Sequence, residues 1–364
     1  MNNKPRQKVS TMDWIEPTRL AQNALHGALS RYVNGAVFSR SDLLRALLTP
    51  ASVLRRHSGG IIRVLHAYRE HLLSSVTTEI NLDVEVYRGK NPYVHRMMEY
   101  VEQHLKQDVI GAYVHGSLGT YEEIAYSDFD ALVILKSGVF ESPARLVKVA
   151  ERLHRAKTIM YEFDPLQHHG WFVLIEDDLP FYCEAYFPVG LFQYAKSLIE
   201  NRRQPLSISR RDSLYEINDT FENVANSVVR KIDQNQYPTN IYQLKSLLSE
   251  FMLLPALYIQ RKTGTGVFKK FCFSEARRDF DPDVWHIMDE ASMLRQEWAY
   301  NLPHWQRRIA SGGNALRNYL VGKWAPTIPH HMKLRLTQNF YARMRHLALQ
   351  MRDCFINVGN NGPK

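Results

Sequence analysis

GSLGTYEEIAYSDFD, residues 116–130, lies between two short apolar segments, and we expect it to lie at the centre of the fold. The segments on either side, VIGAYVH (109–115) and ALVIL (131–135), are rich in apolar and β-branched residues, which predicts two buried strands. The first strand ends at Gly116-Ser117. Gly116 can adopt a positive φ and has no Cβ, so a phosphate can come close to the backbone there.

Two aspartates, Asp128 and Asp130, come at the start of the second predicted strand. Residues two apart on a strand face the same side, so the two carboxylates lie together while Phe129 turns to the core. Adjacent carboxylates repel one another unless a cation lies between them, and oxygen ligands of this kind suit Mg²⁺. A phosphate-binding turn beside such a pair is typical of phosphoryl or nucleotidyl transfer. The alternative is a strand end with two solvated aspartates.

These residues resemble the signature motif of the nucleotidyltransferase superfamily, which includes DNA polymerase beta, aminoglycoside nucleotidyltransferases and poly(A) polymerases. The matching residues are Gly116-Ser117 and Asp128-Phe129-Asp130. A longer form, similar to the glutamine synthetase adenylyltransferase branch, adds Leu118, Gly119, Glu122 and Ser127, with Tyr121 where that branch usually has arginine. The resemblance implies a mixed β-sheet flanked by helices. It also implies a Mg²⁺-dependent enzyme that moves NMP, with AMP from ATP favoured, to an acceptor hydroxyl and releases pyrophosphate.

The resemblance further implies that two Mg²⁺ ions are held by Asp128, Asp130 and a third carboxylate. Two candidates remain open for the third, and Asp164 is preferred to Glu184. Asp164 follows a predicted strand at 158–163, whereas Glu184 falls within a predicted strand at 181–187. Between them, a further predicted strand at 171–176 follows His168 and His169. Either histidine can contact phosphate, act as a base towards the acceptor, or only hydrogen-bond a turn.

Candidate phosphate-binding residues lie in two parts of the chain. Gly116 and Ser117 are expected to cradle the β- and γ-phosphates, and three lysines are expected to contact the triphosphate: Lys245, Lys269 and Lys270. Each lysine has the alternative of a solvated surface position. Glycines precede lysines in residues 263–270, but the strand–GxxxxGK[ST]–helix pattern of a P-loop is missing.

Hydrophobic periodicity predicts three parts: a helical N-terminal extension (1–85), a catalytic α/β domain (86–200) and a helical C-terminal domain (201–364). Residues 14–73 have a helical pattern, and 76–87 predict an edge strand. Helices are expected at 92–107 and 142–157, and the chain is expected to be helical from about residue 205. The most apolar stretch, 241–261, predicts a buried helix that Pro255 kinks or breaks and that ends at 263–266.

The net charge of +9 is unevenly distributed. Residues 301–364 contain ten Lys and Arg against one acid, Asp353, which suggests an anionic partner. We expect this basic face, with Lys333, Arg345 and Arg352, to border the catalytic cleft. The alternative is a solvated basic surface.

Other features limit the class of protein. Cys183, Cys272 and Cys354 are far apart in sequence, which favours a reduced, cytoplasmic setting and argues against zinc. No signal peptide or membrane span is expected. The acceptor remains open among a small molecule, an RNA end and a protein side chain. A rival interpretation is a non-catalytic nucleotide- or nucleic-acid-binding protein that keeps the fold; it predicts a degraded acidic cluster.

Overall fold

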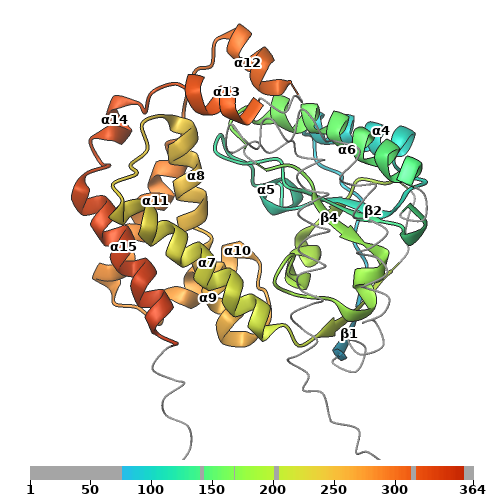
Figure 1. Cartoon of the computed structure of the whole chain (residues 1–364), viewed down its shortest axis with the longest axis horizontal. Coiled ribbons are helices and arrows are strands. Elements are labelled where there is room, and N and C mark those ends of the chain that lie inside the picture. The colour runs from blue at the N-terminus through green and yellow to red at the C-terminus, as the bar shows by residue number, and fades with distance from the viewer. Residues whose placement is uncertain (1–75, 140–142, 168, 201–204, 313–316, 356–364) are drawn as a thin grey trace, which may run out of the picture.

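The computed structural model describes residues 76–139, 143–167, 169–200, 205–312 and 317–355. The helices expected at 14–73, and most of the expected extension, lie outside these residues. The described part has two halves. A mixed sheet flanked by helices forms one, and a group of helices from the C-terminal part of the chain forms the other (Figure 1).

A four-stranded sheet is the centre of the first half. Its strands are β2 (Val109–Val114), β3 (Ala131–Leu135), β4 (Phe172–Ile175) and β5 (Lys196–Ser197), in the order β4-β3-β2-β5. β2 pairs antiparallel with β3 and with β5, and β3 pairs parallel with β4. The strands predicted at 109–115, 131–135 and 171–176 are therefore confirmed, within one or two residues at their ends.

Both faces of this sheet are covered, which explains why β3 is apolar throughout. One face packs against α4 (Pro92–His104) and α6 (Pro143–Phe163), and Val133 of β3 belongs to that cluster. The opposite face contains Leu132 and Ile134, which pack under the 3₁₀ helices η2 (Glu176–Phe181) and η3 (Val189–Tyr194). Alternate residues of a strand point to opposite faces, so a strand buried on both sides needs no polar positions.

A separate two-stranded ribbon lies beside the second face. β1 (Val76–Leu82) pairs antiparallel with β6 (Leu206–Arg211). The edge strand expected at 76–87 is thus confirmed for its first residues. The expectation that the chain is helical from residue 205 is wrong at its start, because Leu206 and Ile208 of β6 are buried in the second cluster before the helices begin.

Two predicted strands are not strands. Residues 158–163 continue α6, because Ile159 and Met160 are buried against the sheet and packing overrides their β-propensity. Residue 181 ends the 3₁₀ helix η2, and residues 182–187 follow it as an irregular loop with a single bridge, from Tyr182 to Arg210. Tyr182 instead donates a hydrogen bond from its hydroxyl to Phe187 O at 2.5 Å, which closes this loop on itself.

The second half is all helical. It contains α7 (Leu214–Asp233), α8 (Ile241–Phe251), α9 (Leu254–Thr263), α10 (Lys269–Arg277), α11 (Pro282–Gln296), α12 (His304–Ser311), α13 (Arg317–Trp324), α14 (His330–Lys333) and α15 (Gln338–Asp353). The break predicted by Pro255 is confirmed, since this proline lies in the first turn of α9, where its missing N–H costs nothing. Gly264 ends α9 with φ 73°, as predicted for residues 263–266.

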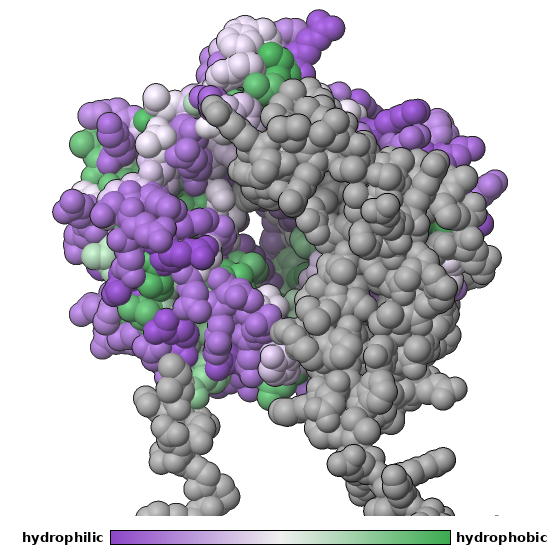
Figure 2. Space-filling model, viewed as in Figure 1, coloured by the Kyte–Doolittle hydropathy of each residue, from purple (hydrophilic) through white to green (hydrophobic). Residues whose placement is uncertain are grey.

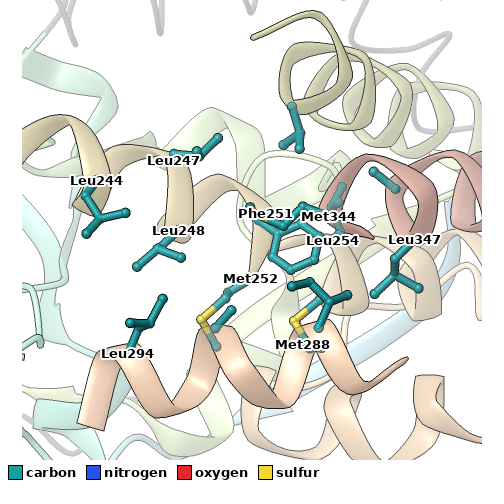
Figure 3. Close-up of a cluster of buried hydrophobic side chains, with 14 of the residues drawn as sticks. Leu244, Leu247, Leu248, Phe251, Met252, Leu254, Met288, Leu294, Met344 and Leu347 are labelled. Atoms are coloured by element: carbon teal, nitrogen blue, oxygen red, sulfur yellow. The ribbon is translucent and has the colours of Figure 1, made fainter. Parts of the chain in front are cut away.

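The core of this helical half is built from leucines and methionines of α8, α9, α11 and α15 (Figure 3). Phe251 of α8 lies close to Met288 of α11 and Met344 of α15, whereas Leu248 of α8 points towards Leu294 of α11. The outer surface of these helices is mainly hydrophilic on the face seen in Figure 2. No helix in the described ranges is long and apolar enough to cross a membrane.

The two halves are joined by direct packing. Tyr126, from the segment between β2 and β3, is buried in the core of the helical half, where its ring packs edge-on against Trp298. Its hydroxyl donates to Lys245 O at 3.0 Å and lies 2.8 Å from Ser249 Oγ. At the top of Figure 1, α12 packs against α6. The helical half therefore borders the segment that carries the two aspartates.

Leu248→Ala should destabilise the protein by about 2–5 kcal/mol, because this side chain is fully buried and its loss leaves a cavity. Leu253→Ala is the matched control. Leu253 lies between α8 and α9 and is 37% exposed, so its loss should cost less than about 1 kcal/mol. Urea unfolding followed by circular dichroism measures both changes. Equal losses would contradict the packing described for α8.

Candidate active site

Gly116 brings the turn after β2 into contact with the second aspartate. Its φ is 63°, and the short helix α5 (Gly116–Gly119) starts there. A Cβ added to Gly116 would lie 2.5 Å from Asp130 Oδ2. The glycine is therefore needed twice, for its left-handed backbone and for the close approach of the carboxylate. The turn and the acid pair predicted from sequence do lie side by side.

Asp128 and Asp130 precede β3 rather than lying on it, which corrects the sequence prediction. The two carboxylates still face the same side, because hydrogen bonds hold the backbone at Phe129 and Asp130. Gln167 accepts a hydrogen bond from Phe129 N at 2.7 Å and donates one to Phe129 O at 3.1 Å. His115 N donates to Asp130 O at 3.0 Å. With the Phe129 side chain fully buried, as predicted, its two neighbours face away from the core.

Arg317 holds Gln167 in place from the helical half. Its guanidinium donates to Gln167 O at 2.5 Å, to Pro165 O at 2.6 Å and to Ala310 O at 2.6 Å. The guanidinium also lies 3.5 Å from the centre of the Tyr161 ring. A planar group with several donors is well suited to fix carbonyl oxygens in this way. Arg317 and Gln167 thus position the aspartates without touching them.

Asp164, the preferred third carboxylate, lies immediately after α6 and beside Asp128. The two aspartates share one cation. Lys245 Nζ is 2.6 Å from Asp164 Oδ2 and 2.8 Å from Asp128 Oδ1. Asp164 Oδ1 accepts from Leu166 N at 3.0 Å and lies 3.5 Å from the Tyr300 hydroxyl.

Lys245 is fully buried, with its ammonium 4.9 Å from the centre of the Tyr126 ring. Burial opposes its charge, but the two carboxylates raise the pKa of Lys245 above its ordinary value, so it stays protonated. Burial, together with repulsion from Asp128, raises the pKa of Asp164, and Lys245 opposes that rise.

His169 provides a second positive group between the carboxylates. Its Nε2 lies 3.3 Å from Asp130 Oδ1 and 3.6 Å from Asp128 Oδ2. Although burial lowers it, the pKa of His169 is raised to about 9 by these two carboxylates. Burial and repulsion from Asp128 raise the pKa of Asp130, against the effect of His169. His168, the other predicted histidine, lies outside the described residues.

The three predicted phosphate-binding lysines have different surroundings. Lys245 pairs with Asp128 and Asp164, and its contact with phosphate stays a prediction. Lys270 pairs with Glu122 Oε1 at 2.5 Å on the exposed surface. Lys269, the first residue of α10, lies near Asp130, and burial together with repulsion from Arg295 lowers the pKa of Lys269 to about 8.

Arg295 of α11 completes this basic group and was missed in the sequence. It lies over the Tyr126 ring, 4.9 Å from its centre, and its Nε is buried with no hydrogen-bond partner among the described residues. Nothing in the local sequence marks Arg295, Gln167, Tyr300 or Arg317, because their roles depend on contacts between distant segments. Lys245 did carry a signal, because it is the one basic residue of α8 and lies between the apolar residues Leu244 and Leu247.

Glu184, the alternative third carboxylate, lies elsewhere and has its own partners. Its Oε2 accepts from Gly266 N at 3.2 Å and from Val189 N at 3.3 Å, and its Oε1 lies 3.7 Å from Arg210 Nη1. These contacts tie the loop after η2 to the loop before α10. Glu184 therefore joins the two halves, while Asp164 is the candidate that meets Asp128.

The basic C-terminal helix does not border the acidic cluster, contrary to expectation. α15 packs on α7, α9 and α11, at the side of the helical half away from the sheet (Figure 1). Arg345 pairs with Asp233 at 2.5 Å, and Arg352 pairs with Asp353 at 2.9 Å. Lys333, in α14, is exposed. The positive groups near the aspartates are instead Lys245, His169 and Lys269.

Within the described residues, no group of three or more His, Cys, Asp or Glu side chains is arranged to hold a metal ion by itself. The cysteines do not form such a group: Cys272 is buried, Cys183 half-buried and Cys354 exposed, and all three are free thiols. A metal ion here would need ligands that the protein does not supply. Mg²⁺ commonly takes one or two carboxylates and completes its shell with water and phosphate oxygens.

Comparison with known proteins adds no assignment. No family model and no curated protein matches the chain.

Gly116→Ala should destabilise the protein more than Gly264→Ala, although both positions have positive φ. At Gly264 nothing lies within 4 Å of an added Cβ, so the cost is the left-handed backbone alone, about 1–2 kcal/mol. At Gly116 the added Cβ must also displace the Asp130 carboxylate. Urea unfolding compares the two variants, and equal losses would show that the turn and the carboxylate are not in contact.

Proposed function

We propose that this protein is a nucleotidyltransferase that transfers NMP, with AMP favoured, from an NTP to an acceptor hydroxyl. The observation that carries the proposal is the contact of the Gly116 turn with Asp130, beside Asp128 and Asp164. The family resemblance of these residues and the mixed sheet beneath them support a nucleotidyltransferase core. The rival binding protein predicts a degraded acidic cluster, whereas here all three carboxylates lie together.

The donors around Asp128 and Asp130 fit one Mg²⁺ ion. Both side chains keep some exposure, 15% and 26%, and both offer only oxygen ligands. His169, 31% exposed, is the neighbouring group that must move aside. When bound with the nucleotide, Mg²⁺ would neutralise phosphate charge and orient the reacting phosphate.

The remaining binding roles belong to residues around the cluster. Gly116 and Ser117 cradle the β- and γ-phosphates, because the positive φ of Gly116 turns backbone N–H groups towards an anion. Lys269 and Arg295 supply positive charge, since Lys269 lies near Asp130 and the buried Nε of Arg295 has no hydrogen-bond partner among the described residues. Lys270, paired with Glu122, fixes α10 against the segment after Gly119 instead.

The transfer itself exchanges one P–O bond for another. The acceptor oxygen forms a bond to the α-phosphorus as the bond from that phosphorus to the β-bridging oxygen breaks. Pyrophosphate leaves with the electron pair of the broken bond, and the hydroxyl proton passes to a carboxylate of the cluster. Gln167 and Arg317 keep the carboxylates aligned while charge develops.

ATP with Mg²⁺ should stabilise the protein, and ATP with EDTA should not, because the ion and the phosphates bind together. At about 100 times Kd the added stability is about 2.7 kcal/mol. The double variant Asp128→Asn/Asp130→Asn should lose this effect, which a thermal-shift assay measures without knowledge of the acceptor. Asp108→Asn is the matched control, since Asp108 is a buried acid paired with Arg145 and Arg152 away from the cluster.

Stabilisation by ATP in the presence of EDTA, retained by the double variant, would support the non-catalytic binder and contradict the enzyme. The acceptor class is found separately. Radiolabelled ATP is incubated with the protein and a cell extract, and the label is followed into small molecules, RNA or protein. The double variant Asp128→Asn/Asp130→Asn should fail to transfer label, whereas the folded control Asp108→Asn should transfer it.

The third carboxylate can be identified by a paired comparison. Asp164→Asn should lower turnover by about 100-fold or more, because it removes a charge from the reacting cluster. Glu184→Gln should lower stability, because it weakens the contacts with Arg210 and Gly266, and leave turnover of the folded protein near that of the wild type. Mg²⁺-dependent pyrophosphate release with the identified acceptor measures both. The reverse pattern would assign the role to Glu184.

A further inference from the structure

We propose that the Lys245 ammonium takes the place of a second divalent cation, so that the acidic cluster binds one metal ion rather than two. The inference rests on the proposed function. Its basis is the position of Nζ, 2.8 Å from Asp128 Oδ1 and 2.6 Å from Asp164 Oδ2. This is the space between the first and third carboxylates, where the resemblance implies a metal.

Lys245 cannot readily leave this position. Its side chain has no exposed surface, and its backbone is part of α8. Tyr126 holds it twice, because the Tyr126 hydroxyl donates to Lys245 O at 3.0 Å and the ring lies 4.9 Å from the ammonium. A protonated lysine moved away from both carboxylates would be a buried charge without compensation, which is strongly unfavourable.

The position between Asp128 and Asp130 differs in each of these respects. The neighbouring cation there is His169, whose side chain is 31% exposed and lies 3.3–3.6 Å from the carboxylates. The longer distances and the exposure leave room for the ring to rotate away when a metal and a nucleotide enter. One side of Asp128 can therefore accept a metal ion, and the other is filled by the protein.

A fixed ammonium also performs part of the work of the missing ion. It keeps the charges of Asp128 and Asp164 apart and compensates them, so both carboxylates remain oriented in the absence of substrate. It cannot coordinate the acceptor oxygen as a Lewis acid, so the acceptor would be activated by carboxylates alone. Lys245 is thus a positioning residue for the cluster and not a phosphate ligand.

Counting bound Mn²⁺ tests the inference without measuring activity. Free Mn²⁺ is followed by electron paramagnetic resonance as it is titrated into the protein with α,β-methylene-ATP, which cannot transfer its nucleotide. The wild type should bind about one Mn²⁺ per chain. Lys245→Met should bind about two, because the Asp128–Asp164 position is then open to a cation.

Two further variants guard against a simple loss of folding. Lys245→Met/Asp164→Asn removes both members of the buried pair, so it should stay folded and return to about one Mn²⁺. Lys157→Met removes another lysine that is 1% exposed, beside Arg317 and Tyr161, and should bind one Mn²⁺ like the wild type. This variant shows how the loss of a buried lysine outside the acidic cluster affects the number of bound Mn²⁺ ions.

Two Mn²⁺ ions per wild-type chain would overturn the inference and leave the proposed nucleotidyltransferase intact. An unchanged count of one in folded Lys245→Met would also overturn it, because the lysine would then not be excluding an ion. Binding of the nucleotide analogue with no Mn²⁺ at all would overturn both the inference and the proposed function.

Discussion

The ammonium group of Lys245 joins the two halves of the molecule at the place where the acidic cluster forms. The lysine comes from the helical half, and the carboxylates of Asp128 and Asp164 come from the sheet half. Burial of an ammonium is unfavourable by several kcal/mol, and it is tolerated here because two carboxylates and an aromatic ring surround the charge. Removal of one partner of such a group typically costs about 3–5 kcal/mol. The relative position of the halves is therefore tied to the charge balance of the cluster.

Short-range patterns were enough to predict the centre of the sheet and the acid pair. Residues 109–135 contain two apolar strands, a glycine turn and two aspartates, and all of these features are specified by neighbouring residues. The break at Pro255 and the end of α9 at Gly264 were predictable for the same reason, since proline and glycine act through their own backbones. The nucleotidyltransferase activity remains a proposal from these residues and their geometry.

The sequence failed to predict features that depend on contacts between distant segments of the chain. The segment 158–163 has β-prone residues, but Ile159 and Met160 find buried positions as part of α6. The pairing of Lys245 with Asp164 was not predicted, because the two residues are 81 positions apart and no sequence pattern brings them together. The arginines of α15 were expected near the cluster, but Arg345 pairs with Asp233 of α7, a residue 112 positions away in the sequence. The sequence shows which residues are charged, but the partner of each charged side chain depends on contacts across the fold.

The contacts around Glu184 show that the two halves are packed as a unit. Gln260 of α9 donates to Glu184 O at 2.7 Å, and Gly266 N donates to its carboxylate. Gly266 also passes so close to Pro188 that an added Cβ would lie 2.0 Å from the proline Cβ. This junction fixes the loop that leads into α10, and Lys269 is the first residue of that helix. The same packing that joins the halves therefore helps to set the position of Lys269 relative to Asp130, so a change at the junction would alter the charge near Asp130 without a direct contact with the acidic cluster.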